Sequence, residues 1–298
     1  MEYYNNDLGI LYKGDCVQEL KNVKDKSQQL ICIDPPYNIG KDYWDIIPDY
    51  YNWLGNIIEI LETKLKDNGT FIIFHNDFRM LALIDMEIQK RTKFLLKNFM
   101  IWNKRFDGSP RKGFLDGYIV KEQLGSFNKM AEYFNFYTFE NSWKLKKRRE
   151  ELKINQLTIS SEIKSKTGGI TGWYSNIETG KNYPTLETIK PITKHLGLTF
   201  DDIVPKFRNQ KTNHSVMNYD IEEKFGHITP KPVKLLENLL LHFTDEGDSV
   251  LDCFGGSGSL AVAAQNQKRN WILIEKEDDY CDISVKRLSN TQLKLDLI

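Results

Sequence analysis

Apolar residues fall along the chain in short continuous runs and in longer stretches of helical spacing. Residues 30–33 are apolar throughout, which predicts a strand buried on both faces of a sheet. Between positions 50 and 65 the apolar residues recur every three or four positions, which predicts an amphipathic helix that ends at Asn68-Gly69. The β-branched and aromatic residues at 69–74 then predict a second strand.

The same alternation of strand and helix continues along the chain, except in the segment 141–213. Such alternation is typical of a mainly parallel, doubly wound sheet with helices on both faces, so we predict an α/β fold. The glycine-rich turn that usually opens such a fold lies near the C-terminus here. We expect further strands at 11–15, 99–102, 249–252 and 271–274, and helices at 80–90, 232–243, 260–267 and 278–288.

The segment 141–213 differs from its surroundings in its short helical patterns and its many lysines. Between Lys144 and Lys211 there are 14 Lys and Arg residues against 7 Asp and Glu, although the whole chain has a formal net charge of +0. A basic segment on an otherwise acidic chain suits a module that contacts nucleic acid. A solvated, lysine-rich helical face is the alternative. We place domain boundaries to give segments 1–140, 141–213 and 214–298.

Composition excludes several classes of protein. No stretch of 18 apolar residues exists, so the sequence predicts no membrane span. The N-terminus lacks the basic and apolar regions of a signal peptide, which indicates a cytoplasmic protein. Cys16, Cys32, Cys253 and Cys281 are not at metal-ligand spacing. We expect them to be reduced and mostly buried, and we expect no metal site.

The glycine-rich turn near the C-terminus has the features of a cofactor site. Glycines let the backbone approach a ligand closely, and Glu275 ends the next strand 19 residues after Gly256, where an acid binds ribose hydroxyls. The turn lacks the third glycine of a dinucleotide site, which favours S-adenosylmethionine over NAD. A turn without a ligand is the alternative. The candidate residues are Asp252, Phe254, Gly255, Gly256, Ser257, Gly258 and Glu275.

A tetrapeptide, Asp34-Pro35-Pro36-Tyr37, directly follows the first apolar run. The exocyclic amine of adenine or cytosine is a weak nucleophile because its lone pair is delocalised into the ring. Acceptors on its two hydrogens, the Asp34 carboxylate and the Pro35 carbonyl, would draw the nitrogen toward tetrahedral geometry. The prolines hold that carbonyl rigid, and Tyr37 offers a ring on which an extruded base stacks. The alternative is a structural turn with an incidental acid.

These elements together resemble the β-class amino-DNA methyltransferases of bacterial restriction–modification systems and phages. In that class the catalytic motif precedes a target-recognition region and then the cofactor motif, and this chain shows that circularly permuted order. The resemblance implies a Rossmann-like methyltransferase sheet, S-adenosyl-L-methionine as cofactor, and Asp34 to Tyr37 as catalytic motif, with Asp34 also near the cofactor. Similar short motifs imply further cofactor contacts at Asp15, Cys16, Thr229 and Lys231.

The resemblance also bears on the reaction and its partners. An aspartate in the first position of the catalytic motif is more typical of N6-adenine enzymes, and a serine of N4-cytosine enzymes. The predicted activity is therefore site-specific DNA adenine-N6 methylation. N4-cytosine methylation and a DNA-binding regulator without turnover are the alternatives. The implied partners are double-stranded DNA, a second copy in a homodimer, and a cognate restriction endonuclease.

The insertion looks like a Cro/repressor-type helix-turn-helix, with expected helices at 159–166, 170–178 and 184–195. The second helix of such a module enters the major groove, while lysines contact phosphates. A small packing bundle with Trp173 in its core is the alternative. The candidate DNA-binding residues are Thr171, Trp173, Tyr174, Asn176, Lys164, Lys166 and Lys181 in the insertion, and Lys104, Arg105, Arg111 and Lys112 in a basic loop.

Overall fold

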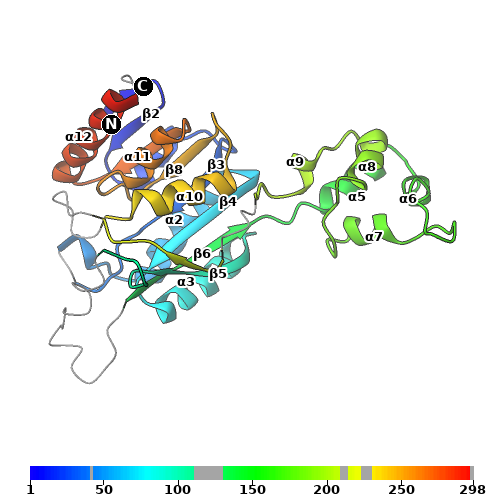
Figure 1. Cartoon of the computed structure of the whole chain (residues 1–298), viewed down its shortest axis with the longest axis horizontal. Coiled ribbons are helices and arrows are strands. Elements are labelled where there is room, and N and C mark those ends of the chain that lie inside the picture. Colours follow the sequence, from blue (N-terminus) through cyan, green and yellow to red (C-terminus); the bar gives the residue numbers. More distant parts are fainter. Residues whose placement is uncertain (41–42, 111–129, 209–213, 223–229, 296–298) are drawn as a thin grey trace.

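The computed structural model describes residues 1–40, 43–110, 130–208, 214–222 and 230–295, with side chains up to residue 291 (Figure 1). The strands are β1 Glu2–Asn6, β2 Gly9–Lys13, β3 Gln28–Ile33, β4 Leu65–His75, β5 Leu95–Asn103, β6 Ala131–Thr138, β7 Val216–Asn218, β8 Ser249–Asp252 and β9 Asn270–Glu275. The longer helices are α2 Tyr50–Lys64, α3 Phe78–Arg91, α10 Val233–Phe243, α11 Ser259–Asn266 and α12 Asp278–Leu295. The shorter ones are α1 Cys16–Glu19, η1 Leu20–Asn22, η2 Tyr43–Asp45, α5 Trp143–Glu151, α6 Gln156–Ser160, α7 Trp173–Glu178, α8 Ile189–Leu196 and α9 Phe200–Ile203.

The strands form one sheet in the order β1-β2-β9-β8-β3-β4-β6-β5-β7. The run from β2 through β9, β8 and β3 to β4 is parallel, whereas β6 is antiparallel to both of its neighbours. The predicted doubly wound α/β fold is thus confirmed. We call the edge where β3, β4, β8 and β9 end the carboxyl edge, and the edge where they begin the amino edge.

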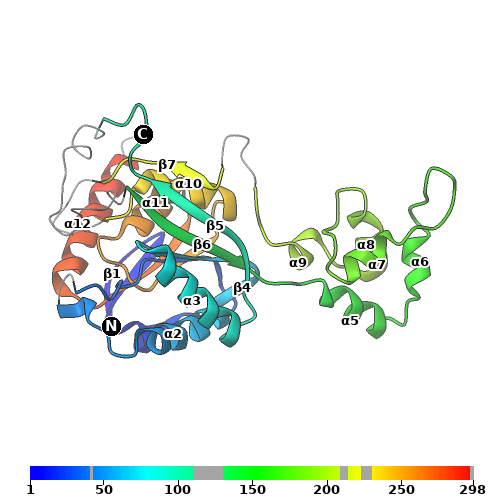
Figure 2. The same cartoon turned by 90° about the horizontal axis from the view of Figure 1, so that it is seen from below.

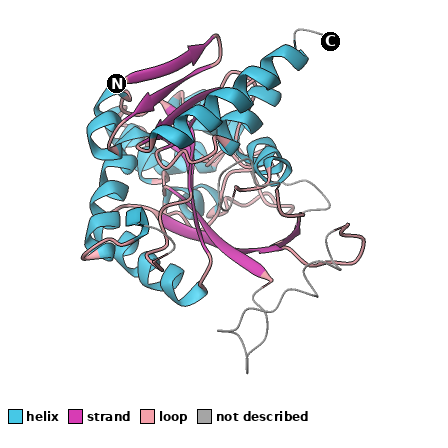
Figure 3. Ribbon diagram, turned by 90° about the vertical axis from the view of Figure 1, so that its left-hand side faces the viewer, coloured by secondary structure: helices cyan, strands magenta, loops and turns pink. Residues whose placement is uncertain are grey.

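Helices cover both faces of this sheet, as Figure 3 shows. Leu30 and Ile72 pack toward α10, α11 and α12, whereas Ile31 and Ile73 pack toward α1, α2 and α3. Successive side chains of a strand point to opposite faces, so a strand between two helical layers must be apolar at every position. This explains the continuous apolar run of β3, which is fully buried. We call this three-layer body the α/β lobe.

The helices α5 to α9 form a second body, the insertion, which projects from one end of the α/β lobe (Figures 1 and 2). It has its own small core, in which Leu145, Ile177 and Ile192 are buried. Tyr174 is fully buried in the same core, and its hydroxyl donates to Glu178 at 3.2 Å. The prediction that Tyr174 faces DNA is therefore wrong, because this ring fills the centre of the insertion.

Several predicted element boundaries are also wrong. The helix from Tyr50 ends at Lys64, and Asn68-Gly69 lies inside β4, where the pairing with β3 is irregular. In the insertion, Lys164 pairs with Ile170 in an antiparallel bridge, so the helix expected at 159–166 stops at Ser160. The later helices begin only at Trp173 and Ile189, and β6 has no counterpart among the predicted strands.

Two expectations from composition concern the described residues as a whole. All four cysteines are free and buried, which confirms the prediction of reduced internal thiols. Among the described residues, none of the helices combines the length and the apolar character that a membrane crossing needs.

Candidate active site

Two turns that lie far apart in the sequence meet at the carboxyl edge of the sheet. β3 ends at Ile33, just before Asp34, and β8 ends at Asp252, just before the glycine-rich turn. Because β3 and β8 are neighbouring parallel strands, with Leu30 opposite Val250, the two turns leave the sheet side by side. Between them lies a cavity of about 400 Å³.

The cavity gathers most of the catalytic and cofactor-binding residues that the sequence predicts. Gly258 is not part of its lining and instead precedes α11, with a left-handed backbone at φ 72°. Thr229 lies outside the described residues. The predicted site residues that line the cavity are Asp15, Cys16, Asp34, Pro35, Pro36, Tyr37, Lys231, Asp252, Phe254, Gly255, Gly256, Ser257 and Glu275.

The glycine-rich turn packs closely against the end of β9. A Cβ atom on Gly255 would lie 2.7 Å from the Leu273 side chain, so this position needs glycine. The Gly255 N–H donates to the Ile274 carbonyl at 2.8 Å, and the Gly256 N–H donates to the Glu275 carboxylate at 2.6 Å. These contacts fix the turn and Glu275 relative to each other at the cavity wall.

Carboxyl groups dominate the polar side of this wall. Burial raises the pKa of Glu275, although backbone N–H groups donate to its carboxylate. Burial also raises the pKa of Asp252 to about 8, and the nearby carboxyl groups of Asp34 and Glu275 act in the same direction. The Phe254 N–H, which donates to Asp252 at 2.9 Å, opposes this shift. Such a wall favours a cationic ligand and disfavours a pyrophosphate. It fits the sulfonium and ammonium groups of S-adenosylmethionine.

The turn after β2 forms another side of the cavity. The Gly14 N–H donates to the Glu275 carbonyl at 2.8 Å, which holds this turn beside the end of β9. Asp15 caps α1 by accepting two backbone N–H groups at 3.0 and 3.3 Å. The rings of Trp53 and Phe254, with centroids 5.7 Å apart, add an aromatic surface. Trp53 escapes sequence-based prediction because it falls within an ordinary helical pattern.

The Asp34 turn presents two acceptors at the cavity. The Tyr37 hydroxyl donates to Asp34 Oδ1 at 2.5 Å and so fixes the carboxylate. The Tyr50 hydroxyl donates to the Pro36 carbonyl at 2.7 Å, whereas none of the described residues donates to the Pro35 carbonyl. The acceptor positions of the Pro35 carbonyl therefore stay available within the described part of the chain.

The Tyr37 ring is more enclosed than the sequence suggests, with 7% of the residue exposed. It packs against His75, with ring centroids 4.5 Å apart, and the Lys231 ammonium lies 5.5 Å from its centroid. Burial and the Asp34 carboxylate raise the pKa of the Tyr37 hydroxyl well above its usual range, so it is a neutral donor. Base stacking on this ring stays a prediction.

A chain of alternating charges runs inward from Asp34. Lys231 forms an ion pair with Asp34 and lies 3.2 Å from Glu132, whose other oxygen pairs with Lys104. The side chains of Lys231 and Glu132 are only 6% and 7% exposed. Burial lowers the pKa of Lys231, but the two carboxylates outweigh it and raise that pKa. Burial likewise raises the pKa of Glu132, but Lys231 and Lys104 outweigh it, so Glu132 is an anion.

Glu132 has no counterpart among the residues that the sequence predicts for the site. It lies near the start of β6, in a stretch without a motif, and only the pairing of that strand with β4 and β5 brings it to Asp34. Lys104, which the sequence assigns to DNA, instead directs its ammonium to Glu132. The signal that could reveal this pair is a carboxylate in a strand of mostly apolar and aromatic residues.

Comparison with known proteins identifies the family. A family model of DNA methylases, covering N6 and N4 enzymes, matches residues 28–286. The chain belongs to this DNA methylase family. It is 27% identical over 284 residues to the type II methyltransferase M1.MboII of Moraxella bovis. The aligned region covers 92% of this chain and 94% of that protein.

Two further comparisons agree with this membership. The DNA methylase is 27% identical over 294 residues to the DNA adenine methyltransferase YhdJ of Escherichia coli K12, covering 96% of this chain and 84% of that protein. Its fold resembles the crystal structure of the M1.HpyAVI–SAM complex, with a TM-score of 0.55 at 19% identity over 94% of this chain and 99% of that one. At that identity the second likeness supports the fold alone.

The predicted DNA contacts of this DNA methylase fall in two separate regions. Arg105 is exposed beside the site, while Arg111 and Lys112 lie outside the described residues. Trp173 is half-buried, and its indole N–H donates to the Ser160 carbonyl at 3.0 Å, which makes it a packing residue. The remaining candidates sit on the insertion, away from the cavity: Thr171, Lys164, Lys166 and Lys181 are exposed and Asn176 is half-buried.

Proposed function

We propose that this DNA methylase is an S-adenosylmethionine-dependent, site-specific adenine-N6 methyltransferase that acts on a base turned out of the duplex. The observation that carries the proposal is the placement of the Asp34 carboxylate and the Pro35 carbonyl at the cavity that the glycine-rich turn also lines. Aspartate in the first position of the motif supports adenine, as does the likeness to the adenine methyltransferase YhdJ. N4-cytosine methylation is the second candidate, because the family includes such enzymes.

In the proposed mechanism the two acceptors activate the exocyclic amine. Each Asp34 oxygen has two acceptor positions, so one stays available on each beside the Tyr37 hydroxyl and the Lys231 ammonium. Asp34 and the Pro35 carbonyl then accept the two amine hydrogens and draw the nitrogen toward tetrahedral geometry. Transfer of the methyl group would break its bond to the sulfonium sulfur, which would leave as a neutral thioether, and would leave the amine with one proton too many. Asp34 is placed to take that proton.

The remaining cavity residues bind and orient the reactants. S-adenosylmethionine supplies an electrophilic methyl group on a sulfonium, which needs no metal. We assign its binding to the glycine-rich turn and to Asp252 and Glu275, because their carboxyl groups complement its positive charges. Asp15 and Cys16 line the same cavity from the side that the turn after β2 forms. Lys231, predicted as a cofactor neighbour, we assign to Asp34, with which it forms an ion pair.

We place the substrate duplex across the carboxyl edge, where the extruded base can enter the cavity. Arg105 belongs to the chain that leaves β5 at this edge, and Met130, whose carbonyl accepts the Lys104 N–H at 2.9 Å, belongs to the chain that enters β6. Flipping a base costs a few kcal/mol, which stacking inside a site offsets. A homodimer and a cognate restriction endonuclease stay predictions from the resemblance.

The proposal is tested by transfer of labelled methyl groups to unmethylated bacterial DNA, followed by nucleoside analysis. We expect label in N6-methyladenine, and we expect Asp34→Ala to reduce turnover by about a hundredfold or more while the dissociation constant for S-adenosylmethionine changes by a few-fold. Asp25→Ala, which removes an exposed carboxylate far from the cavity, is the matched control. Label in N4-methylcytosine would replace the assigned base. Absence of label in DNA, with cofactor binding intact, would refute the proposed activity.

A further inference from the structure

The insertion holds a defined shape through a buried polar centre. Glu178, at the end of α7, accepts Arg149 of α5 at 2.6 Å, Gln156 of α6 at 3.0 Å and the Tyr174 hydroxyl at 3.2 Å. One carboxylate therefore ties three helices together around the core. A buried carboxylate with this many donors fixes the orientation of its neighbours, so the surface that the insertion presents is preformed.

The chain that enters the insertion is clamped to the amino edge of the sheet. Asp67, near the start of β4, pairs with Lys144 at 2.7 Å and with Lys26 at 2.9 Å. The Asn141 side-chain amide donates to the Asp67 carbonyl at 2.6 Å. The outgoing connection is therefore held at the end of β4 that lies opposite the cavity.

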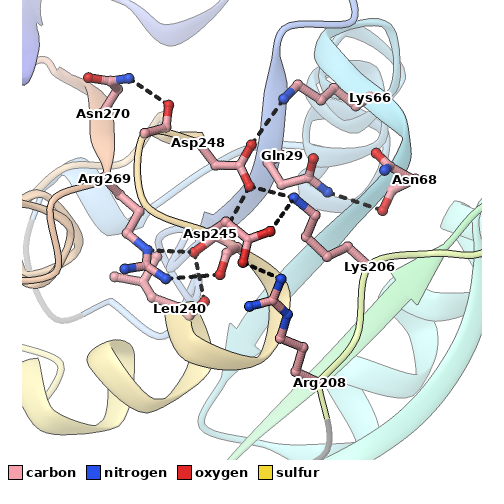
Figure 4. Close-up of polar contacts among 12 residues, drawn as sticks. Gln29, Lys66, Asn68, Lys206, Arg208, Leu240, Asp245, Asp248, Arg269 and Asn270 are labelled. Atoms are coloured by element: carbon pink, nitrogen blue, oxygen red, sulfur yellow. Dashed lines mark hydrogen bonds and ion pairs between the residues drawn. The ribbon is translucent and has the colours of Figure 1, made fainter. Parts of the chain in front are cut away.

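The chain that returns from the insertion is clamped at the same edge, as Figure 4 shows. Lys206 lies 2.8 Å from Asp248 and 3.0 Å from Asp245, and its N–H donates to the Asn68 carbonyl at 2.9 Å. Arg208 pairs with Asp245 at 2.5 Å. Both connections are thus tied to the α/β lobe by ion pairs and by hydrogen bonds to backbone carbonyls of β4, which sets the direction in which the insertion points.

This placement separates the insertion from the cavity by the length of the sheet. β4 runs for 11 residues from Leu65 at the amino edge to His75 at the carboxyl edge. At ~3.3 Å per residue that is about 33 Å, or ~10 base pairs of duplex. From the amino edge the insertion extends still farther from the α/β lobe in both Figures 1 and 2. It cannot touch base pairs next to a base held in its own cavity.

The exposed surface of the insertion nevertheless suits a polyanion. Among the described residues, its basic side chains in ion pairs are Lys144, Arg148, Arg149, Lys194 and His195. By contrast, the exposed ammonium groups of Lys164, Lys166 and Lys181 have no carboxylate partner among the described residues. Thr171, Ser175 and Asn176 add hydrogen-bonding side chains on and before α7. Unpaired lysines beside polar side chains are the combination that contacts phosphates and base edges of duplex DNA.

We propose that the insertion binds duplex DNA at a stretch about 10 base pairs or more from the base that enters the cavity of the same chain. It is a second DNA-binding site, and it does not read the base pairs around the methylated base. This inference rests on the proposed function in one respect: the duplex to be methylated lies across the carboxyl edge.

The test compares methylation of two duplexes that share one methylated site, located beforehand by sequencing of modified DNA. A duplex of about 14 base pairs extends only ~24 Å to each side of its centre, and one of about 40 base pairs extends ~68 Å. The variant Lys164→Ala/Lys166→Ala/Lys181→Ala is compared with Lys21→Ala/Lys24→Ala/Lys93→Ala, which removes three exposed lysines of the α/β lobe. Both variants lose the same charge.

We expect the insertion variant to lose about tenfold in kcat/KM on the long duplex and less than twofold on the short one, with a shallower salt dependence only on the long one. An equal loss on both duplexes would overturn the inference, because the insertion would then read the methylated site, in cis or in a partner's cavity. No loss on either would overturn it too. The affinities of both variants for the long duplex are also measured, by fluorescence anisotropy without cofactor. This measurement tests DNA binding by the insertion independently of methyl transfer.

Discussion

Replacing Glu132 by Gln tests the chain of charges behind Asp34. The substitution keeps the size of the side chain and removes the negative charge that lies between Lys231 and Lys104. Removing one partner of a buried ion pair typically costs ~3–5 kcal/mol. The glutamine oxygen still accepts a hydrogen bond worth ~1 kcal/mol, and Lys231 keeps its contact with Asp34. We therefore expect a loss of ~2–4 kcal/mol in the free energy of unfolding of the α/β lobe at pH 7.

The stability loss caused by Glu132→Gln should depend on pH in a definite direction. The lysines lower the pKa of Glu132 from its unfolded value of 4.5 to about 2. A carboxylate with a depressed folded pKa stabilises the folded state above its unfolded pKa, and this contribution disappears as the pH falls through the folded pKa. The difference between wild type and Glu132→Gln should therefore be complete above pH 5 and shrink from pH 4.5 toward pH 2.

Urea unfolding followed by circular dichroism at pH 7 and at pH 3 measures both quantities. Glu178→Gln is the matched control, because Glu178 is also a buried acid that pairs with a basic side chain, Arg149 at 2.6 Å, but in the insertion. Only Glu132→Gln should also lower kcat, since Lys231, which pairs with Asp34, then loses its second carboxylate partner. Equal stability of Glu132→Gln and wild type at pH 7, or a loss of the same size at pH 7 and pH 3, would refute the reasoning.

Two further predictions concern the cavity. Burial raises the pKa of Asp252 to about 8, so below that pH a cationic ligand must displace a proton from this carboxyl group. The affinity for S-adenosylmethionine should therefore rise by up to ~10-fold per pH unit between pH 6 and 8 and level off above pH 8. Calorimetry with Asp252→Asn should give a weaker affinity that is flat with pH, and a flat wild-type profile would contradict the assignment. Tyr37→Phe removes the hydroxyl that fixes Asp34, a bond to a charged group worth ~1.5–3 kcal/mol, so single-turnover methylation should slow by ~10–100-fold. Unchanged turnover would mean that the Tyr37 hydroxyl does not position Asp34.

Much of the site follows from the sequence because strand direction links distant motifs. An apolar run such as β3 has to be a central strand, and a parallel sheet brings the carboxyl ends of its strands to one edge. The Asp34 turn and the glycine-rich turn could therefore be predicted to meet, although more than two hundred residues separate them. Glu275 follows for the same reason, since it ends the strand next to β8.

The residues that the sequence misses depend on contacts that no local pattern encodes. Tyr174 lies in a helix of six residues, too short for its apolar spacing to tell a buried face from an exposed one. Its burial is decided by Leu145 and Ile192, which come from other helices. Lys104 reads as a free cation in a basic loop, and only the approach of Glu132 across the sheet turns it into an ion-pair partner.

The direction of β6 explains both what reaches the active site and what leaves it. β6 is antiparallel to β4, with Tyr133 opposite His75 and Tyr137 opposite Phe71. Its first residues therefore lie at the carboxyl edge, where Glu132 joins Lys231 and Asp34. Its last residues lie at the amino edge, so whatever follows β6 departs from the side away from the cavity. If β6 ran parallel to β4, its first residues would lie at the amino edge and its last residues at the carboxyl edge. The insertion would then begin beside the extruded base, and no carboxylate would lie behind Asp34.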